Sequence, residues 1–258
     1  MKSKHFYIRK THRFLGVFLG VQFLLWTLGG LYFSWSNLDE VHGDFEKKSP
    51  PLLSSNISLV SPSAVLDSIK KVHNFDSVVT IQLIEILGKP FYQVRCVAKK
   101  HKAENHKHEM QSINHLADAE TGRLRSPLSK EEAIAVAKLR FNGTPKVKSV
   151  EYVTNTNGHH EYRESPLPAY AVTFDNSANT TVYVTSELGT VQKFRNNKWR
   201  MFDFLWMMHT MDYNGRDDFG NILLRIFSLV GLITVISGFA LYFVSSKNFR
   251  KKKLVLAQ

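Results

Sequence analysis

The sequence predicts an α+β domain, built of two helix-plus-antiparallel-sheet units, carried between two transmembrane helices. Two long apolar runs predict the helices, since residues 14–35 and residues 226–244 contain no charged side chain. At about 1.5 Å per residue, a helix of either length crosses a hydrocarbon layer of about 30 Å. A weak internal repeat between the runs, with a helical pattern followed by strand-like segments, predicts the domain. We therefore expect a membrane protein.

Basic residues at both ends of the chain predict its orientation. Lys and Arg collect on the cytoplasmic side of short flanking segments. Neither tail holds an acidic residue, and together they hold ten basic ones: Lys2, Lys4, Arg9, Lys10, Arg13, Lys247, Arg250, Lys251, Lys252 and Lys253. We expect both termini to be cytoplasmic and the central domain to be periplasmic, in the inner membrane of a bacterium.

The same tails explain the formal net charge of +12. The rest of the chain holds 24 basic residues against 22 acidic ones, so its surface is nearly balanced. This distribution disfavours nucleic acid as a partner and indicates the lipid bilayer instead.

A cleaved signal peptide is the alternative for the first run, because it also follows a basic segment. The run is longer than the roughly 7 to 15 apolar residues of a signal peptide. It ends on Tyr32, Phe33, Ser34 and Trp35 rather than on a small-residue cleavage site. These features favour a retained anchor, with Tyr32 and Trp35 at the outer interface.

The expected segments follow from these patterns. They are a cytoplasmic tail 1–13, a first span 14–35, a linker 36–60, a first unit 61–126, a second unit 127–196, an interfacial segment 197–221, a second span 222–244 and a tail 245–258.

Each central unit begins with a short amphipathic helix and ends at a glycine turn. The helices are expected at 61–72 and 129–139, with Ser61 and Ser129 as N-caps. The strands that follow are expected at 78–86, 91–98, 147–154 and 169–174. Gly122 and Gly189 lie 67 residues apart, each at a turn that needs a positive φ.

The single cysteine, Cys96, alternates with polar residues on the same side as Val94. We expect its side chain on the inner face of a strand, and no intramolecular disulfide can form.

Three segments carry a resemblance to a known family. They are the closing turn Asp118-x-x-Thr121-Gly122, the basic segment 9–16 before the first span, and the segment 199–213, which contains Trp199-Arg200, Asp203-Phe204-Leu205-Trp206 and His209-Thr210-Met211-Asp212-Tyr213. The turn resembles PepSY domains, and the whole chain is similar to the short two-span form of the PepSY-associated transmembrane family.

The resemblance implies periplasmic binding or inhibition of a partner, as for PepSY domains in peptidase propeptides. Larger relatives include iron-regulated membrane proteins and ferric-siderophore reductases that carry haem between helices. This chain has only two expected spans. A haem site between four helices therefore requires a homodimer or a membrane partner protein.

Three histidines near the expected membrane surfaces are candidate ligands of haem b: His12, His42 and His209. His12 and His209 lie on opposite sides of the bilayer and cannot share one haem within one subunit. His42 and His209 are both outside and could meet as a bis-imidazole pair. His12 either pairs with its mate in a dimer or is an interfacial residue near lipid head groups. The other histidines have simpler interpretations: His101, His106, His108 and His115 in or beside a solvated loop, and His159 and His160 at an exposed turn.

Small residues line one face of each expected span. On the His12 face of the first they are Gly16, Gly20, Phe23, Thr27 and Gly30, and the second offers Ser228, Gly231, Val235, Gly238 and Tyr242. Such faces allow two helices to pack closely, or they make room for a flat cofactor in a dimer. Gln22 is expected to donate a hydrogen bond to the second span. Asp203, Asp212, Asp217 and Asp218 are expected to cap or pair.

The chain has no motif of a hydrolase, a zinc protease or a phosphate-binding loop, and no flavin or nicotinamide signature. Two functions remain open. The first is a periplasmic binding or regulatory domain on a membrane anchor. The second is a haem-dependent electron-transfer component of ferric-siderophore and iron uptake, acting as a dimer.

Overall fold

The computed structural model describes residues 4–100 and 109–245, which form two compact units. One unit combines the two ends of the chain, up to residue 36 and from residue 201, and the other comprises residues 37–200. The helices are α1 Lys4–Trp35, α2 Leu38–His42, the 3-10 helix η1 Asp44–Glu46, α3 Pro62–Lys70, α4 Lys130–Arg140, α5 Asn197–Thr210 and α6 Ile222–Ser245. The strands are β1 Ser77–Ile86, β2 Lys89–Lys100, β3 Glu109–Asp118, β4 Leu124–Arg125, β5 Val147–Val153, β6 Ala169–Phe174, β7 Thr181–Thr185 and β8 Val191–Arg195.

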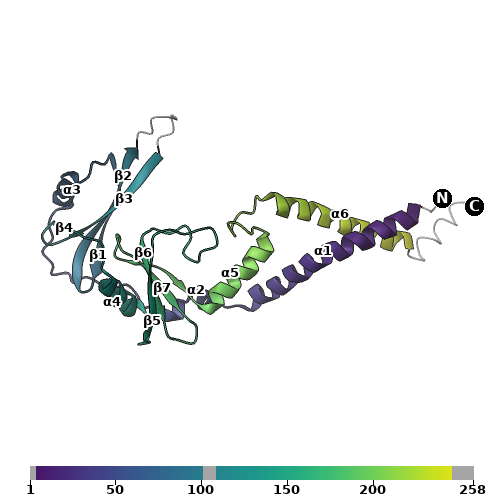
Figure 1. Ribbon diagram of the computed structural model, residues 1–258, viewed down its shortest axis with the longest axis horizontal. Coiled ribbons are helices and arrows are strands. Elements are labelled where there is room, and N and C mark those ends of the chain that lie inside the picture. Colours follow the sequence, from purple (N-terminus) through teal and green to yellow (C-terminus); the bar gives the residue numbers. More distant parts are fainter. Residues whose placement is uncertain (1–3, 101–108, 246–258) are drawn as a thin grey trace, which may run out of the picture. The chain divides into compact units, whose positions relative to one another are not determined.

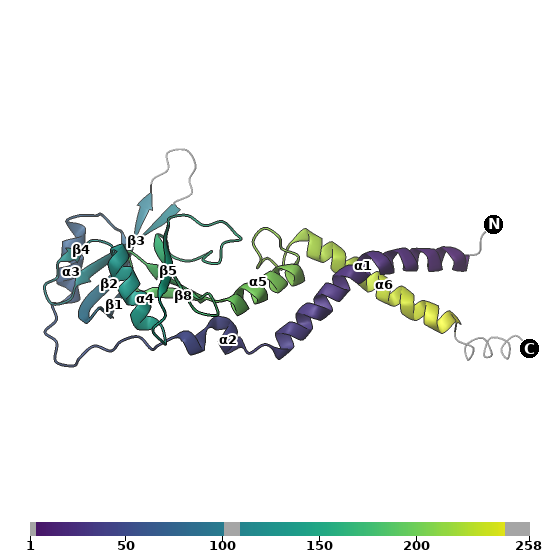
Figure 2. The same ribbon diagram turned by 60° about the horizontal axis from the view of Figure 1, so that its bottom comes forward.

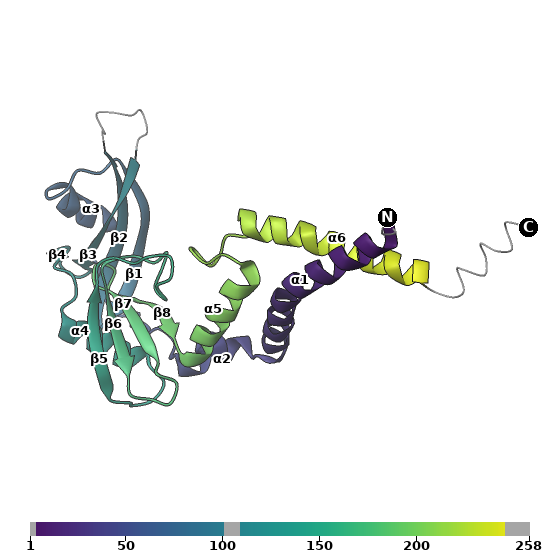
Figure 3. The same ribbon diagram turned by 45° about the vertical axis from the view of Figure 1, so that its right-hand side comes forward.

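The terminal unit is built on α1 and α6, which cross each other (Figures 2 and 3). Both are long and apolar enough to span a membrane, over residues 9–35 and 222–243, and most of their side chains are exposed. Leu19, Met211 and Phe227 form a small buried cluster in this unit. The two helices therefore fit a membrane protein whose apolar surface faces lipid rather than a protein core.

The first helix begins ten residues earlier than the apolar run that predicted it. Lys, Arg and His residues between positions 4 and 13 continue the helix, since long straight side chains favour this conformation and a helix need not end at the edge of the hydrocarbon. The second helix has nearly the expected bounds.

The small-residue faces are only half confirmed. An added Cβ at Gly231 would lie 3.2 Å from the Phe23 ring, and one at Gly238 would lie 3.3 Å from the His12 ring, so both glycines of α6 face α1 closely. On α1, by contrast, added Cβ atoms at Gly16, Gly20 and Gly30 would meet no described atom within 4 Å. The expected packing through the α1 glycines is wrong within this chain, because the large rings of His12 and Phe23 make the contact.

Gln22 is the second correction in this unit. Its side-chain amide donates a hydrogen bond to the carbonyl of Met208 in α5, at 2.8 Å, and not to α6. The four aspartates do cap or pair as expected: Asp203 pairs with Arg216, Asp217 accepts from Trp206, and Asp212 and Asp218 accept backbone N–H groups.

Residues 61–195 contain the same arrangement twice. In the first copy α3 is followed by an antiparallel sheet in the order β1-β2-β3-β4, and in the second α4 is followed by the order β5-β6-β7-β8 (Figure 1). Ser61 and Ser129 cap the two helices as predicted, and Ser129 forms a full capping box with Glu132. The four predicted strands correspond to β1, β2, β5 and β6, and each sheet has two further strands, which flank its glycine turn: β3 and β4 in the first copy, β7 and β8 in the second.

Each helix covers one face of its own sheet. Val65 and Ile69 of α3 pack on Tyr92, Val94 and Cys96, so the thiol is buried as expected, and burial raises its pKa. Ala133, Val136 and Ala137 of α4 pack on the second sheet, in a cluster that also includes residues of β1, β2 and β3. The two copies thus meet in one hydrophobic cluster, whereas the cluster under α3 belongs to the first copy alone.

The two closing turns match in backbone geometry. Gly122 and Gly189 have φ values of 71° and 68°, and their N–H groups donate to the carbonyls of Asp118 and Thr185, four residues earlier. Both glycine predictions are therefore confirmed.

Residues 37–60, which precede the first copy in the chain, contact both copies. Asn142 donates its N–H to the carbonyl of Glu46, and Lys48 donates to the carbonyl of Arg140, which fixes the early linker beside α4. Val60 donates to the carbonyl of Ala119, which fixes its end beside β3. Residues 50–53 therefore pass over the junction of the two copies.

The interpretation of His115 as part of a solvated loop is wrong. His115 lies in β3, on the face that α3 covers, 5.0 Å from His73 between ring centroids. The polar residues on the other face of β3 concealed the strand pattern. The predictions for His101, His106 and His108 lie outside the described residues.

Candidate functional site

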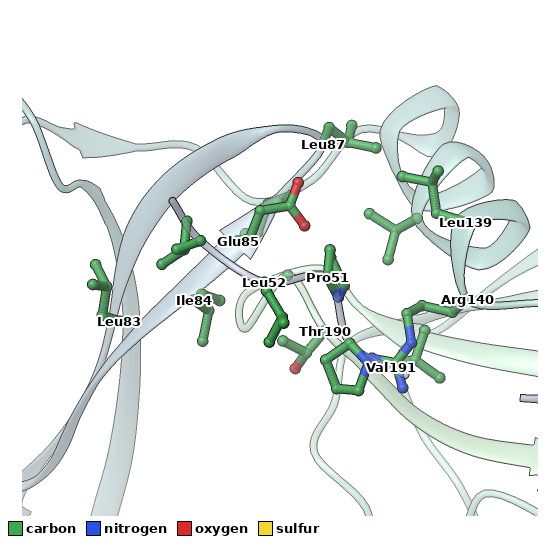
Figure 4. A pocket seen from close by; sticks show the side chains of 15 residues that line it. Pro51, Leu52, Leu83, Ile84, Glu85, Leu87, Leu139, Arg140, Thr190 and Val191 are labelled. Atoms are coloured by element: carbon green, nitrogen blue, oxygen red, sulfur yellow. The ribbon is translucent and has the colours of Figure 1, made fainter. Parts of the chain in front are cut away.

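The best-defined cavity of the described chain lies within residues 37–200, where the two copies meet. It has a volume of about 350 Å³, in the range of small-ligand pockets. Its walls are the end of β1, the C-terminal half of α4 and the turn between β7 and β8, and residues 50–53 pass across it (Figure 4).

The local sequence explains why two of these walls, α4 and β1, present side chains to the cavity. Val136, Leu139 and Arg140 are three and four residues apart, so they lie on one side of α4. Leu83, Ile84 and the residues up to Leu87 form the free edge of the first sheet, because β1 is its outermost strand.

Gly189 allows the β7–β8 turn, which is the third wall of the cavity, to pack closely against the first sheet. A Cβ atom at this position would lie 2.4 Å from Cδ1 of Ile86 and 3.1 Å from Cδ1 of Leu116, well inside van der Waals contact. Only glycine therefore lets the β7–β8 turn pack directly on the first sheet. Gln93 secures the approach by donating its side-chain amide to the carbonyl of Leu188, at 2.7 Å.

Two charged groups lie among these apolar walls. Glu85 of β1 accepts a hydrogen bond from the N–H of Gly88 through Oε1, whereas its Oε2 is buried and has no partner in the part of the chain that the structure describes. Arg140 of α4 donates from Nε to the carbonyl of Lys48, at 3.0 Å, and burial lowers the pKa of its guanidinium. No hydrogen bond or ion pair joins Glu85 to Arg140 in the described chain.

The three predicted haem ligands have different environments. His12 lies in α1, with Nδ1 2.7 Å from the hydroxyl of Ser237, and its ring packs on Gly238 of α6. A Cβ built at Gly238 would lie 3.3 Å from Cε1 and 3.8 Å from Nε2 of His12, so this side of the imidazole ring faces α6 closely. Haem ligation by His12 stays a prediction.

His209 lies near the end of α5 among aromatic rings. Its ring centroid is 5.5 Å from that of Trp26 and 6.3 Å from that of Trp206, which is nearly parallel to it. Its Nδ1 is buried and has no hydrogen-bond partner among the described residues, and the same holds for the indole Nε1 of Trp26. A ligand-forming histidine normally donates this proton to an acceptor, so the observed environment lacks that support.

His42 is exposed at the end of α2, in the unit of residues 37–200, whereas His12 and His209 belong to the terminal unit. The pairing of His42 with His209 stays a prediction. Among residues 4–100 and 109–245, no three His, Cys, Asp or Glu side chains form a group that holds a metal ion.

A polar cluster on the second sheet was not predicted. Arg200 donates from Nε to Oε2 of Glu161, at 2.7 Å, and the hydroxyl of Tyr183 donates to Oε1, at 2.9 Å. The Arg195 guanidinium lies 3.9 Å from the Trp199 ring centroid, and burial lowers its pKa to about 10. These contacts hold residues 154–168 on the open face of the sheet. The Trp199-Arg200 pair was the only available signal, but nothing local indicated Glu161 as its partner.

No protein-family profile matches the chain, and neither a curated protein nor a solved structure does. The fold and site thus define a class by architecture alone: two helices of membrane-spanning length and an α+β domain with a repeated helix and sheet.

Proposed function

We propose that the chain is a membrane-anchored binding protein. In this proposal α1 and α6 span the inner membrane of a bacterium, both tails are cytoplasmic, and residues 37–200 are a periplasmic domain of the PepSY type. The domain binds a small ligand or a segment of a partner, without catalysing a reaction. The pocket between β1, α4 and the β7–β8 turn is the observation that carries the proposal.

Two features support a binding role for this pocket. Its walls are mostly apolar, whereas Glu85 and Arg140 supply a few polar contacts, a composition typical of ligand sites. The buried, unpartnered Oε2 of Glu85 also gains stability from a donor that a ligand brings.

The charge distribution and the exposed helix surfaces support the membrane topology. The ten basic residues of the tails favour a cytoplasmic location of both ends. The open glycine face of α1 leaves room for a second helix, so a homodimer or a membrane partner protein remains part of the proposal.

Binding of indole tests the pocket without assuming its natural ligand. Indole is apolar, and its N–H is able to donate to Glu85. The full chain in lipid nanodiscs, titrated by equilibrium dialysis, should bind one indole per chain. Leu139→Trp, which places a large ring at the pocket wall, should abolish this binding, whereas Lys138→Trp on the exposed side of α4 should not. Equal binding by both variants, or no binding by the wild type, contradicts the proposal.

The electron-transfer alternative depends on His209. The specific observation in its favour is that Nδ1 of His209 is buried among aromatic rings with no hydrogen-bond partner in the described chain, so this nitrogen is itself available as the ligand, whereas ligation through Nε2 lacks the usual acceptor at Nδ1. If haem b binds, it supplies the redox chemistry, and His209 of this chain, with His42 or a partner's histidine, holds it. A reduced-minus-oxidised spectrum of protein from haem-replete cells decides this point: an α band lost in His209→Ala supports electron transfer, and no Soret absorbance in folded protein contradicts it.

A further inference from the structure

The pocket carries two opposite charges on separate walls. Glu85 extends from β1, and its carboxylate points toward the segment around Pro51 (Figure 4). Arg140 extends from α4, and among residues 4–100 and 109–245 its guanidinium makes a hydrogen bond only through Nε, so its terminal N–H groups face no partner there and can serve a ligand. One wall thus attracts a cation and the other an anion.

Glu85 has a specific need for a donor. Its Oε1 accepts the Gly88 N–H, but Oε2 is shielded from solvent and has no partner in the described chain. A buried carboxylate oxygen without a hydrogen bond is unfavourable, so a turn of the Glu85 side chain that brings this oxygen into the cavity and against an ammonium group is favoured.

The surface between the charges is apolar. Leu83, Ile84 and Val191 contribute to it from the strands, and Val136 and Leu139 contribute from α4. A ligand that suits this arrangement has its charges at two ends and apolar groups between them. A lipid headgroup does not, because its charges are adjacent and its apolar tails extend away from both.

We propose that this pocket binds a short peptide with free termini and apolar side chains, its ammonium group at Glu85 and its carboxylate at Arg140. The inference rests on the proposed binding function and names the ligand class of the same pocket. Charge-assisted hydrogen bonds at both ends fix the orientation of the peptide, and the apolar walls accept its side chains.

Capped peptides test each end separately. The full chain in nanodiscs is titrated calorimetrically with Leu-Leu, N-acetyl-Leu-Leu, Leu-Leu-amide and free leucine. Loss of either terminal charge should weaken binding by about tenfold or more, as expected for a charge-assisted hydrogen bond. Free leucine should bind more weakly than Leu-Leu. Equal affinity of the capped and uncapped peptides, or a free leucine that binds as tightly, overturns the assignment.

Two substitutions connect these preferences to the residues. Glu85→Gln keeps the side-chain shape and should remove the preference for a free amino terminus while retaining the preference for a free carboxylate. Arg140→Gln should have the opposite effect. Glu151→Gln, on the exposed part of β5, is the matched control and should change neither preference. A Glu85→Gln protein that still discriminates against N-acetyl-Leu-Leu contradicts the role of Glu85.

The indole titration separates the two possible failures. If indole binds and Leu-Leu does not, the pocket is a binding site but the peptide assignment is wrong. If neither ligand binds, the proposed function itself is wrong.

Discussion

The two repeats share their order of elements but differ in what their closing turns contact. A Cβ atom at Gly122 would lie 3.5 Å from Val60, an ordinary contact, whereas one at Gly189 would overlap Ile86. The first turn lies at the edge of its own sheet, and the second is inserted against the sheet of the other repeat. The same glycine turn therefore has two roles: in the first repeat it only closes the sheet, and in the second it also packs on the other sheet and forms a wall of the pocket.

Replacement of the two glycines by alanine gives the largest expected contrast. Gly122→Ala should cost about 1 kcal/mol of unfolding free energy, from the positive φ alone. Gly189→Ala adds overpacking against Ile86 and Leu116, so its cost should be about 3 kcal/mol. Denaturant unfolding of both variants in the same detergent measures the difference. Equal costs mean that the second turn does not pack as described.

The next largest effect is expected for the ion pair between Glu161 and Arg200, which is found only in the second repeat and holds residues 154–168 on its sheet. Glu161→Ala leaves Arg200 without its carboxylate partner and Tyr183 without its acceptor. The pair is partly exposed, so we expect a loss of about 2 kcal/mol, less than for a fully buried pair. Glu151→Ala, at an exposed carboxylate, is the control and should be neutral in the same unfolding assay.

The two helix caps should differ more modestly. Ser129 accepts the N–H of Glu132 and takes part in a capping box, whereas the Ser61 hydroxyl accepts the N–H of Ser63, at 3.3 Å, and shares a hydrogen bond with the Ser63 hydroxyl, at 2.8 Å. Ser129→Ala should cost about 1 kcal/mol and Ser61→Ala about 0.5 kcal/mol. A larger effect at Ser61 would reverse the predicted order.

The smallest expected effect is a pH dependence confined to the first repeat. Burial and the nearby His73 lower the pKa of His115. The equivalent position of the second repeat, 67 residues later in β7, is Val182, which has no titratable group. As pH falls below about 6.5, the unfolded chain binds a proton at this histidine before the folded chain does, so stability decreases. His115→Val should reduce the slope of unfolding free energy against pH below 6.5. An unchanged slope would show that His115 does not cause it.

The features predicted from the sequence are those encoded by nearby residues. Ser61 and Ser129 precede amphipathic patterns, the apolar runs have the length of a membrane, and glycine is the usual residue at a positive φ. Each of these signals requires only a few neighbours along the chain.

The site was not predicted because its parts are distant in sequence. Glu85 and Arg140 are 55 residues apart and belong to different repeats, and only the approach at Gly189 brings their elements together. The same reason conceals Glu161 and Arg200. His115 was missed because polar residues on one face of β3 resemble a loop when the strand pairing is unknown.

The proposed binding function requires that residues 37–200 lie on the outer side of a membrane that α1 and α6 both span. A membrane-impermeant maleimide tests this in intact spheroplasts, in a Cys96→Ser background. We predict that Lys71→Cys, exposed after α3, is labelled without permeabilisation, and that Ser3→Cys is labelled only after it. Labelling of Ser3→Cys but not of Lys71→Cys in intact spheroplasts would contradict the central claim.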